Sequence, residues 1–584
     1  MQMIVFFDFE VVKYDWLVVI IDPINAEETV IVNDPEKLEQ FYQNHKTDIW
    51  IGYNNRTYDN YILKSILLGF DPKEVNDYII VKKMKGWQYS SLFNQIQLYS
   101  FDCLTDKRFS LKQLESFLGN SIKETSTPFD IDRKLTDEEI ADMVKYCRHD
   151  VEQTMIIFNK RKNEFDAQLA LLKAFDLPIN YIGKTQAQLA AIILGAKHKD
   201  YYDEWNIRIP ETLVINKYGF VADWFLDSDN HNDDSYLECE IAGVPHIVKW
   251  GGLHGAINKY QYTCTDDELL IMADVDQLYP TLMIRYKLLS RSVSDYGKFE
   301  KILSESLRLK KEGKKKEREP YKRICNITYG AEGDVFNAMY DPLHRKLVCV
   351  YGQLLMVDLI EKIEGFADLI QSNTDGILIR IKRKDFELLD DTIYEWEKRT
   401  GLHMNFDYYK KIIQKDVNNY IAIPYGDLFD DKGKPLFKST GGYVKALNDL
   451  DYDLPIVNKA MVDYIAYGTP VETTVNNCTS LKEFQKTVKV SNKYICGYHN
   501  HNKLTDKTFR VFASTDPDDT AIYKVKEKPN APFDDPYKYE KFANTPMHCF
   551  IENGDINDVG VPDKLDYYWY IQLAKERLNQ FGVM

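Results

Sequence analysis

The sequence predicts an α/β protein built from several domains. A chain of 584 residues is too long for one hydrophobic core, and the usual size of domains predicts about three to five globular units. Apolar runs rich in β-branched and aromatic residues alternate with amphipathic helical patterns, as in sheets covered by helices. Hydrophobic residues make up 44% of the chain and aromatic residues 13%, which excludes a disordered protein.

The first 165 residues are expected to form one α/β domain. Apolar runs at residues 3–10 and 16–21 predict neighbouring strands of a mixed sheet, and residues 49–53 predict another strand. Thr136, with Glu139 three residues later, has the pattern of a capping box that begins a long helix. The helical patterns of this domain lie at residues 35–44, 60–68, 110–118 and 137–158.

Residues 166–260 are expected to form a connector. A helix is predicted at residues 185–196 and a polar loop at residues 227–234, before the sequence Trp250-Gly251-Gly252. Adjacent glycines let the backbone approach another group closely, so we expect a close approach at this point.

Residues 261–435 combine strands with a basic helical segment. Two helices are predicted around Gly313 within residues 295–330. A hairpin is expected to carry Asp375 at its turn. The predicted strands lie at residues 269–274, 369–373, 377–381 and 419–423, and the other predicted helices at residues 352–364, 384–400 and, near the C-terminus, 567–581.

Composition narrows the class of protein. The first apolar residues run straight into charged ones, and no uncharged run reaches the length of a membrane span. Nine cysteines without a C-x-x-C pair count against zinc and disulfides and fit a reducing cytoplasm. A net charge of −16 ordinarily counts against nucleic-acid binding, but basic residues concentrate at 308–318. Such a basic run alone is more often a solvated helix face. This one lies between two candidate site motifs described below, at residues 274–281 and 322–330, and that position favours nucleic-acid binding.

Asp8 and Glu10 begin the first candidate site. They lie two residues apart on a predicted strand, so both carboxylates project from one face and can share a divalent cation. Such a pair alone is more often two edge charges. Tyr146 and Asp150 lie four residues apart on a predicted helix, so Tyr146 can orient a water beside a metal on Asp150. Two metals bridged by carboxylates can cleave phosphodiesters.

In order and spacing, residues 3–160 resemble the DEDDy exonuclease that precedes the polymerase in family B DNA polymerases. The resemblance implies an RNase H-like 3′-5′ exonuclease domain over residues 1–165. It also implies that Tyr146 positions the nucleophilic water and that Asn55 and Tyr58 contact a frayed 3′ end. The implied metal ligands are Asp8, Glu10, Asp59 and Asp150.

Asp274 begins the second candidate site. It ends an apolar strand, is followed by Leu278-Tyr279-Pro280, and is joined further on by residues 322–330 and by Asp375. Nucleotidyl transfer needs two magnesium ions and, at minimum, two carboxylates from separate strands. Asp274 and Asp375 meet that need if their strands are adjacent.

These segments resemble the three polymerase motifs of family B DNA polymerases, over most of residues 249–445. The resemblance implies a right-hand polymerase with palm at 261–294 and 331–435, fingers at 295–330, and thumb and C-terminal region at 436–584. Asp274, Asp375 and the Val275 carbonyl are implied to bind two Mg²⁺ ions, with Mn²⁺ as the alternative, while Tyr279 excludes a ribose 2′-hydroxyl. Further implied contacts are with the nucleotide, through Lys322, Asn326, Tyr329, Gly330, Arg308 and Lys311, and with DNA, through Gly251, Gly252, Tyr420 and Lys438.

The chain departs from the family pattern at three positions. Asn373 replaces the first aspartate of Asp-Thr-Asp, Ile327 replaces a serine, and Lys249 replaces a tyrosine before the paired glycines. Activity is expected to survive because Asp375 is retained. As a hypothesis, Asp276 restores part of the missing charge, although a turn at Val275 could equally aim it away. Short spacings between motifs leave little room for the insertions of protein-primed polymerases.

The sequence therefore favours a DNA-directed DNA polymerase with proofreading, acting on primer–template DNA, single-stranded DNA and dNTPs. Its size resembles phage or mobile-element replicases, which implies a host cytoplasm, a monomer without membrane contact, and a helicase or single-strand-binding helper. Three alternatives stay open: an exonuclease with a vestigial polymerase half, a protein-primed replicative polymerase, and a non-enzymatic DNA-binding scaffold.

Overall fold

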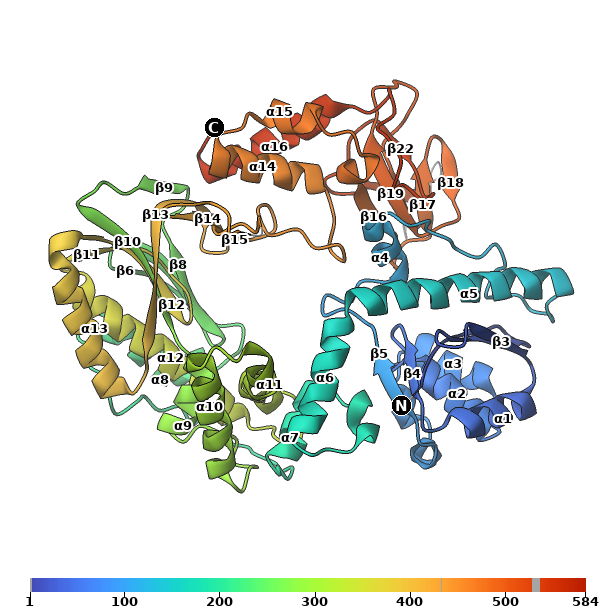
Figure 1. Ribbon diagram of the computed structural model, residues 1–584, viewed down its shortest axis with the longest axis horizontal. Coiled ribbons are helices and arrows are strands. Elements are labelled where there is room, and N and C mark those ends of the chain that lie inside the picture. Colours follow the sequence, from blue (N-terminus) through green and yellow to red (C-terminus); the bar gives the residue numbers. More distant parts are fainter. Residues whose placement is uncertain (1–2, 432, 528–535) are drawn as a thin grey trace. The chain divides into compact units, whose positions relative to one another are not determined.

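A computed structural model describes residues 3–431, 433–527 and 536–584 (Figure 1). The chain divides into two compact units that interleave along the sequence. Unit 1 comprises Met1–Lys184, Leu447–Ile456 and Asn477–Tyr570, and unit 2 comprises Thr185–Ala446, Val457–Asn476 and Ile571–Met584. Both units mix helices with sheets, so the coarse α/β multidomain prediction is confirmed.

Unit 1 begins with a five-stranded mixed sheet in the order β3-β2-β1-β4-β5. Its centre, β1 (Ile4–Val11), runs antiparallel to β2 (Trp16–Asp22) and parallel to β4 (Ile49–Gly52). The three strands and the mixed sheet were predicted, but the strand directions were not. Apolar side chains on both faces of β1 are buried, which is why the strand is nearly continuous in hydrophobic residues. The edge strands are β3 (Glu27–Val32) and β5 (Tyr99–Asp102).

Helices cover this sheet and confirm most of the sequence predictions. Helix α5 (Asp137–Lys160) begins with the predicted capping box of Thr136 and Glu139, and its Phe158 ring packs on Phe6 of β1 at 5.3 Å. The other helices are α1 (Pro35–His45), α2 (Asp59–Leu67), α3 (Pro72–Ile80), α4 (Leu111–Leu118) and α6 (Lys162–Ala174).

The C-terminal part of unit 1 is a β module for which the sequence predicted no strands. A three-stranded sheet pairs β16 (Lys486–Lys489), β19 (Thr508–Ala513) and β22 (Cys549–Ile551). A four-stranded sheet has the order β18 (Asn502–Leu504), β17 (Cys496–His499), β20 (Tyr523–Glu527) and β21 (Tyr537–Lys541). Fully buried Arg510 on β19 donates to carbonyl oxygens at the end of α4, including Ser116 O at 3.2 Å, which ties the module to that helix.

Unit 2 is built on a ten-stranded antiparallel sheet (Figure 1). The central strands β10 (Glu268–Val275), β12 (Gly376–Lys382) and β13 (Met404–Asp416) are adjacent, with β10 in the middle. The outer strands are β6 (Tyr236–Ile241), β7 (Val244–Lys249), β8 (Gly252–Ala256), β9 (Tyr260–Thr263), β11 (Ala367–Ser372), β14 (Asn419–Pro424) and β15 (Lys438–Thr440).

Helix α12 (Pro342–Ile363) is buried on nearly all sides. It begins ten residues before the predicted start, where Asp341 accepts a hydrogen bond from His344 N. Because apolar residues surround the helix, they show no 3.6-residue period that would mark its beginning.

The remaining helices confirm the two predicted around Gly313 and the one at residues 384–400. Helix α9, which carries Tyr279, was not predicted. The helices are α7 (Gln186–Ile193), α8 (Gly219–Leu226), α9 (Leu278–Arg285), α10 (Tyr296–Lys311), α11 (Lys315–Glu332), α13 (Phe386–Thr400), α14 (Pro455–Tyr467), α15 (Val471–Asn476) and α16 (Tyr567–Phe581). Within the described residues, none of the helices combines the length and the hydrophobicity needed to span a bilayer.

Candidate active sites

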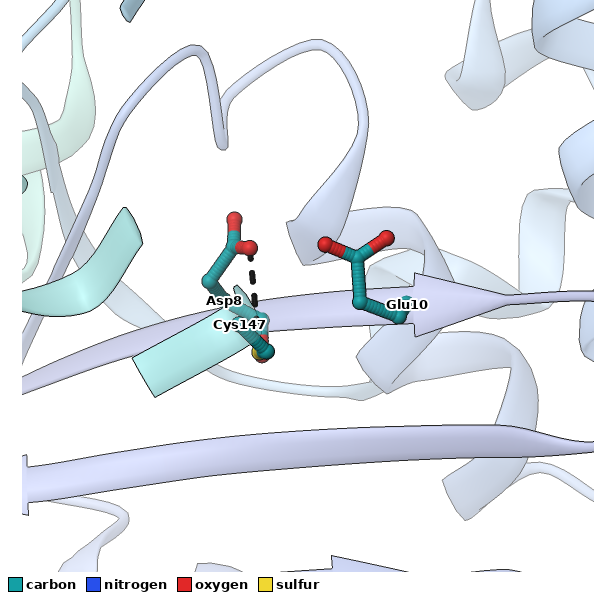
Figure 2. Close-up of side chains that lie close together, drawn as sticks. All are labelled: Asp8, Glu10 and Cys147. Carbon is teal, nitrogen blue, oxygen red and sulfur yellow. Dashed lines mark hydrogen bonds between the residues drawn. The ribbon is translucent and has the colours of Figure 1, made fainter. Parts of the chain in front are cut away.

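The first carboxylate cluster lies on β1 of unit 1. Figure 2 shows the Asp8 and Glu10 side chains leaving the strand on the same side, as two-residue spacing requires. Asp59, the first residue of α2, joins them because its Oδ1 accepts a hydrogen bond from Phe9 N at 3.2 Å. This bond places the start of the helix beside the strand between the two acids.

Helix α5 supplies the fourth carboxylate, Asp150, and the phenol of Tyr146 one turn earlier. The Lys112 ammonium on α4 lies 2.5 Å from Asp150 Oδ1 and 3.1 Å from Glu115 Oε1. It also lies 4.7 Å from the centre of the Tyr146 ring. Lys112 was not predicted as a site residue, because its partner Asp150 lies far along the chain and only the fold joins them.

Burial dominates the electrostatics of this cluster. Burial, and after it the repulsion from neighbouring carboxylates, raises the pKa of Asp8 and of Glu10 well above the usual range. Burial raises the pKa of Asp59 to about 7. It raises the pKa of Asp150 to about 6 against the opposing effect of Lys112. Ionising these carboxylates therefore costs free energy, and a bound cation would offset that cost.

The donor set fits a hard divalent cation. One ligand atom from each of Asp8, Glu10 and Cys147 lies within 4.8 Å of the others, and the same holds for Glu115, His149 and Asp150. Burial raises the pKa of the Cys147 thiol, and its Sγ donates to Asp8 O at 3.2 Å (Figure 2 draws its contact with the Asp8 carboxylate). A protonated thiol is not a metal ligand, so the carboxylate oxygens remain, which are the ligands that Mg²⁺ prefers.

Asn55 and Tyr58 lie next to this cluster with their polar atoms turned to the protein. The fully buried Asn55 amide donates to Ser100 Oγ at 3.0 Å, while its Oδ1 has no hydrogen-bond partner. The Tyr58 hydroxyl donates to Asn76 Oδ1 at 2.8 Å. Their predicted contact with a strand end stays a prediction.

The second site lies where β10 ends and β12 begins in unit 2. The two strands are antiparallel neighbours with Asp274 opposite Gly376, so Asp274 and Asp375 come together as the sequence analysis required. Val275 N donates to Asp375 O at 2.7 Å, and the Asn373 amide oxygen accepts from Asp375 N at 3.3 Å. The Asn373 side chain thus holds the turn that presents Asp375.

Gly376 leaves room for the Asp274 carboxylate on the neighbouring strand. A Cβ atom on Gly376 would lie 2.0 Å from Asp274 Oδ1, closer than atoms can approach. Gly252 shows the close approach predicted for the paired glycines, since its Cβ would lie 2.6 Å from Thr374 Oγ1 in the same hairpin turn.

An open cavity of about 490 Å³ lies above the second site. Residues from the three sequence motifs line it together, although they are far apart in the chain. His254 also lines it and was not predicted. The predicted site residues in its wall are Val275, Tyr279, Asn326, Asp375 and Tyr420.

Tyr279 packs on Tyr329 of α11, with ring centres 4.4 Å apart. Their hydroxyls lie 3.6 and 2.8 Å from the sulfur of Cys349 on α12. Burial raises the pKa of both tyrosines, so both stay protonated. The stack fixes the Tyr279 ring at the floor of the cavity.

Charges at the second site are more exposed than at the first. Asp274 is half-buried, Asp375 is exposed, and Lys438 Nζ lies 3.7 Å from Asp274 Oδ2. Burial raises the pKa of Asp274, and Lys438 opposes this. In the described part of the chain, no three ligating side chains gather here as they do on β1. Two carboxylates and the Val275 carbonyl still offer the oxygen donors that Mg²⁺ prefers.

Two of the basic residues of α10 form ion pairs within the protein. Arg308 pairs with Glu305 on its own helix and with Glu312, the residue that follows the helix, whereas Lys310, which was not predicted, lies 2.5 Å from Asp276 Oδ2. Lys322 lies on α11 one turn before Asn326 and two turns before Gly330, and Lys311 ends α10. The roles of Arg308, Lys311 and Lys322 toward a nucleotide stay predictions.

Comparison with known proteins gives limited information. No protein-family profile matches this chain, and no curated protein sequence matches it. One similar solved structure is the family B DNA polymerase from the hyperthermophilic archaeon Pyrobaculum calidifontis, with a TM-score of 0.42 and 12% identity. The match covers 100% of this chain and 77% of the archaeal chain. A likeness at this level does not identify the family of this chain.

Proposed function

We propose that this chain is a DNA-directed DNA polymerase of the family B type with a 3′-5′ proofreading exonuclease. The observation that carries the proposal is the pairing of Asp274 and Asp375 on adjacent strands beneath a cavity that Tyr279, Asn326 and Tyr420 also line. A separate carboxylate cluster in unit 1 supplies the exonuclease. Primer–template DNA, dNTPs and single-stranded DNA are the proposed substrates.

Asp274, Asp375 and the Val275 carbonyl would hold Mg²⁺ in unit 2, and Asp8, Glu10, Asp59 and Asp150 would hold it in unit 1. When bound, such ions activate an attacking oxygen and neutralise the charge of a leaving group. The chain contributes the positions: the stacked Tyr279 ring limits space at the sugar, and the protonated Tyr146 phenol can donate a hydrogen bond to a phosphate or orient a water.

The test separates the two activities in one assay. A labelled primer on a template is incubated with Mg²⁺, with or without dNTPs, using the wild type, Asp375→Ala and Asp8→Ala. We expect extension to be lost in Asp375→Ala alone and degradation to be lost in Asp8→Ala alone. Asp368→Ala is the matched control, because this exposed acid of β11 pairs with Arg380 in the same sheet, away from the cavity.

A second candidate is an exonuclease whose polymerase half is vestigial. It is favoured by Asn373, which leaves one negative charge out of the hairpin, and by the Lys438 ammonium beside Asp274. This candidate holds if the wild type shortens primers at every dNTP concentration and never extends them.

A further inference from the structure

The four-stranded sheet of the β module has an inner and an outer face. Gly497 faces inward, because a Cβ there would lie 3.0 Å from the Phe509 ring of β19. His499, two residues on, also faces inward, since its Nε2 lies 2.7 Å from Cys549 O of β22. Side chains alternate along a strand, so Tyr498 lies on the outer face.

The pairing of the strands shows which residues of the neighbouring strands share the outer face with Tyr498. Tyr498 is opposite Tyr523 on β20 and Lys503 on β18. Tyr523 is in turn opposite Lys541 on β21, and two and four residues before Lys541 come Tyr539 and Tyr537, which share its face. The outer face therefore carries a group that we call the tyrosine platform, Tyr498, Tyr523, Tyr537 and Tyr539, with two lysines, Lys503 and Lys541.

The tyrosine rings lie over the sheet. Tyr498 and Tyr539 are 5.1 Å apart between ring centres, on either side of β20. Val525, which lies on the same face between their strands, is only 1% exposed, although this is the outer side of the sheet. Tyr539 itself is 39% exposed. The platform therefore covers the small residue beneath it and offers aromatic surface to the solvent.

The charge of the outer face differs in sign from that of the whole chain. This face carries Lys503, Lys541 and Glu527, a net charge of +1, whereas the chain carries −16; the other lysines of the sheet, Lys524, Lys526 and Lys538, lie on the inner face and pair with Glu540. Lys503 Nζ lies 4.9 Å from the centre of the Tyr537 ring. Aromatic faces beside ammonium groups suit a ligand with alternating bases and phosphates, which is a single strand of nucleic acid. A duplex hides its base faces, and a purely apolar partner would leave the lysines uncompensated.

We propose that the tyrosine platform binds single-stranded DNA. Bases stack on Tyr498 and Tyr539, and phosphates contact Lys503, whereas the Lys541 ammonium already donates to Thr545 O. The choice of DNA as the nucleic acid rests on the proposed function. The platform belongs to unit 1, the unit that contains the β1 carboxylate cluster, and it is an additional binding surface distinct from both carboxylate sites.

Binding of a labelled 20-nucleotide oligothymidylate to the full chain in EDTA tests this proposal, with fluorescence anisotropy as the readout. The double variant Tyr498→Ala/Tyr539→Ala is expected to bind about tenfold to a hundredfold more weakly, because two stacking surfaces are lost. Tyr498→Phe/Tyr539→Phe keeps both rings and is expected to stay within about twofold of the wild type. Tyr394→Ala, which removes an exposed tyrosine of α13, is the matched control.

Salt dependence provides a test that keeps all four tyrosine rings in place. Lys503 is exposed, so Lys503→Gln leaves the fold intact and is expected to lower the slope of log affinity against log salt by about 0.7, the contribution of one single-strand phosphate. The proposal is overturned if neither the double alanine variant nor Lys503→Gln changes binding, or if duplex DNA competes as well as single-stranded DNA.

Failure of this proposal and failure of the proposed function give different results. The double alanine variant is expected to extend a saturating short primer–template at the wild-type rate, since neither tyrosine contacts a carboxylate site. If the wild type never extends a primer, the polymerase proposal fails, and the oligothymidylate measurement still decides the platform.

Discussion

The two carboxylate sites both bring negatively charged side chains close together, but they differ in burial and in the number of acids. On β1, acids from β1, α2 and α5 are gathered in a buried group with Lys112 as their cation. Where β10 ends and β12 begins, Asp274 and Asp375 meet, half-buried or exposed, near Asp407 of β13, Lys438 and an open cavity. A buried site suits a short strand end and a few waters, whereas an open one leaves room for a nucleotide and a base pair. From this difference we predict that burial determines the stability and the pKa values of the first site. We predict that backbone geometry determines the activity of the second.

The largest expected effect comes from removing the ammonium group of Lys112 from the buried site. Lys112→Met leaves Asp150 and Glu115 without their ammonium partner, and breaking a buried ion pair costs about 3 to 5 kcal/mol. Urea unfolding in EDTA measures the loss. Lys160→Met removes an exposed pair with Asp449 at 2.5 Å and is expected to cost less than about 1 kcal/mol. Equal losses in the two variants would show that burial does not set the first site apart.

The pH dependence of stability tests the same burial. The pKa of Asp59 is raised to about 7 in the folded chain, above its unfolded value, so the stability it contributes is full at low pH and is lost as pH rises toward 7. We expect the unfolding free energy of the metal-free wild type to fall by about 3 kcal/mol from pH 5 to pH 8, relative to Asp59→Asn, which cannot titrate.

Mg²⁺ is the control for the pH experiment. The ion binds the ionised carboxylates, so adding it should restore more stability at pH 8 than at pH 5. A difference between wild type and Asp59→Asn that stays constant with pH would contradict the raised pKa.

Backbone geometry at the open site is tested by Gly376→Ala. The added Cβ would collide with Asp274 Oδ1, so the Asp274 carboxylate must move from its present position. Displacement of a catalytic group by about 1 Å costs on the order of a hundredfold in rate, and we expect primer extension to fall by about that factor while degradation is unchanged. Gly365→Ala, where an added Cβ meets no atom within 4 Å, is the matched control. If Gly376→Ala lowers both activities equally, the two sites are not independent.

The sequence predicted features that depend on local spacing. The pairs Asp8 with Glu10 and Tyr146 with Asp150 follow from strand and helix periods, and the Thr136 capping box marks a helix start. It did not predict Lys112 or His254 as site residues, because their partners come from distant segments.

Tertiary burial explains the missed elements. Helix α12 is apolar all round and shows no period. The long strand β13 mixes buried and exposed residues without regular alternation, and two strands of the β module, β18 and β22, have only three residues, too few to show a period.

The smallest expected effect concerns Asp276, which we considered as a replacement for the charge missing at Asn373. Its carboxylate lies 2.5 Å from Lys310 Nζ on α10, so a lysine already balances its charge. Asp276→Asn is therefore expected to leave the Mg²⁺ concentration for half-maximal extension unchanged and to alter the rate by less than about threefold, the range of a partly exposed ion pair. Lys310→Gln should reproduce this small change, because both variants break one contact. A large increase in the Mg²⁺ requirement in Asp276→Asn alone would show instead that the open site uses a third carboxylate. The open site would then resemble the buried cluster, in which several carboxylates lie together.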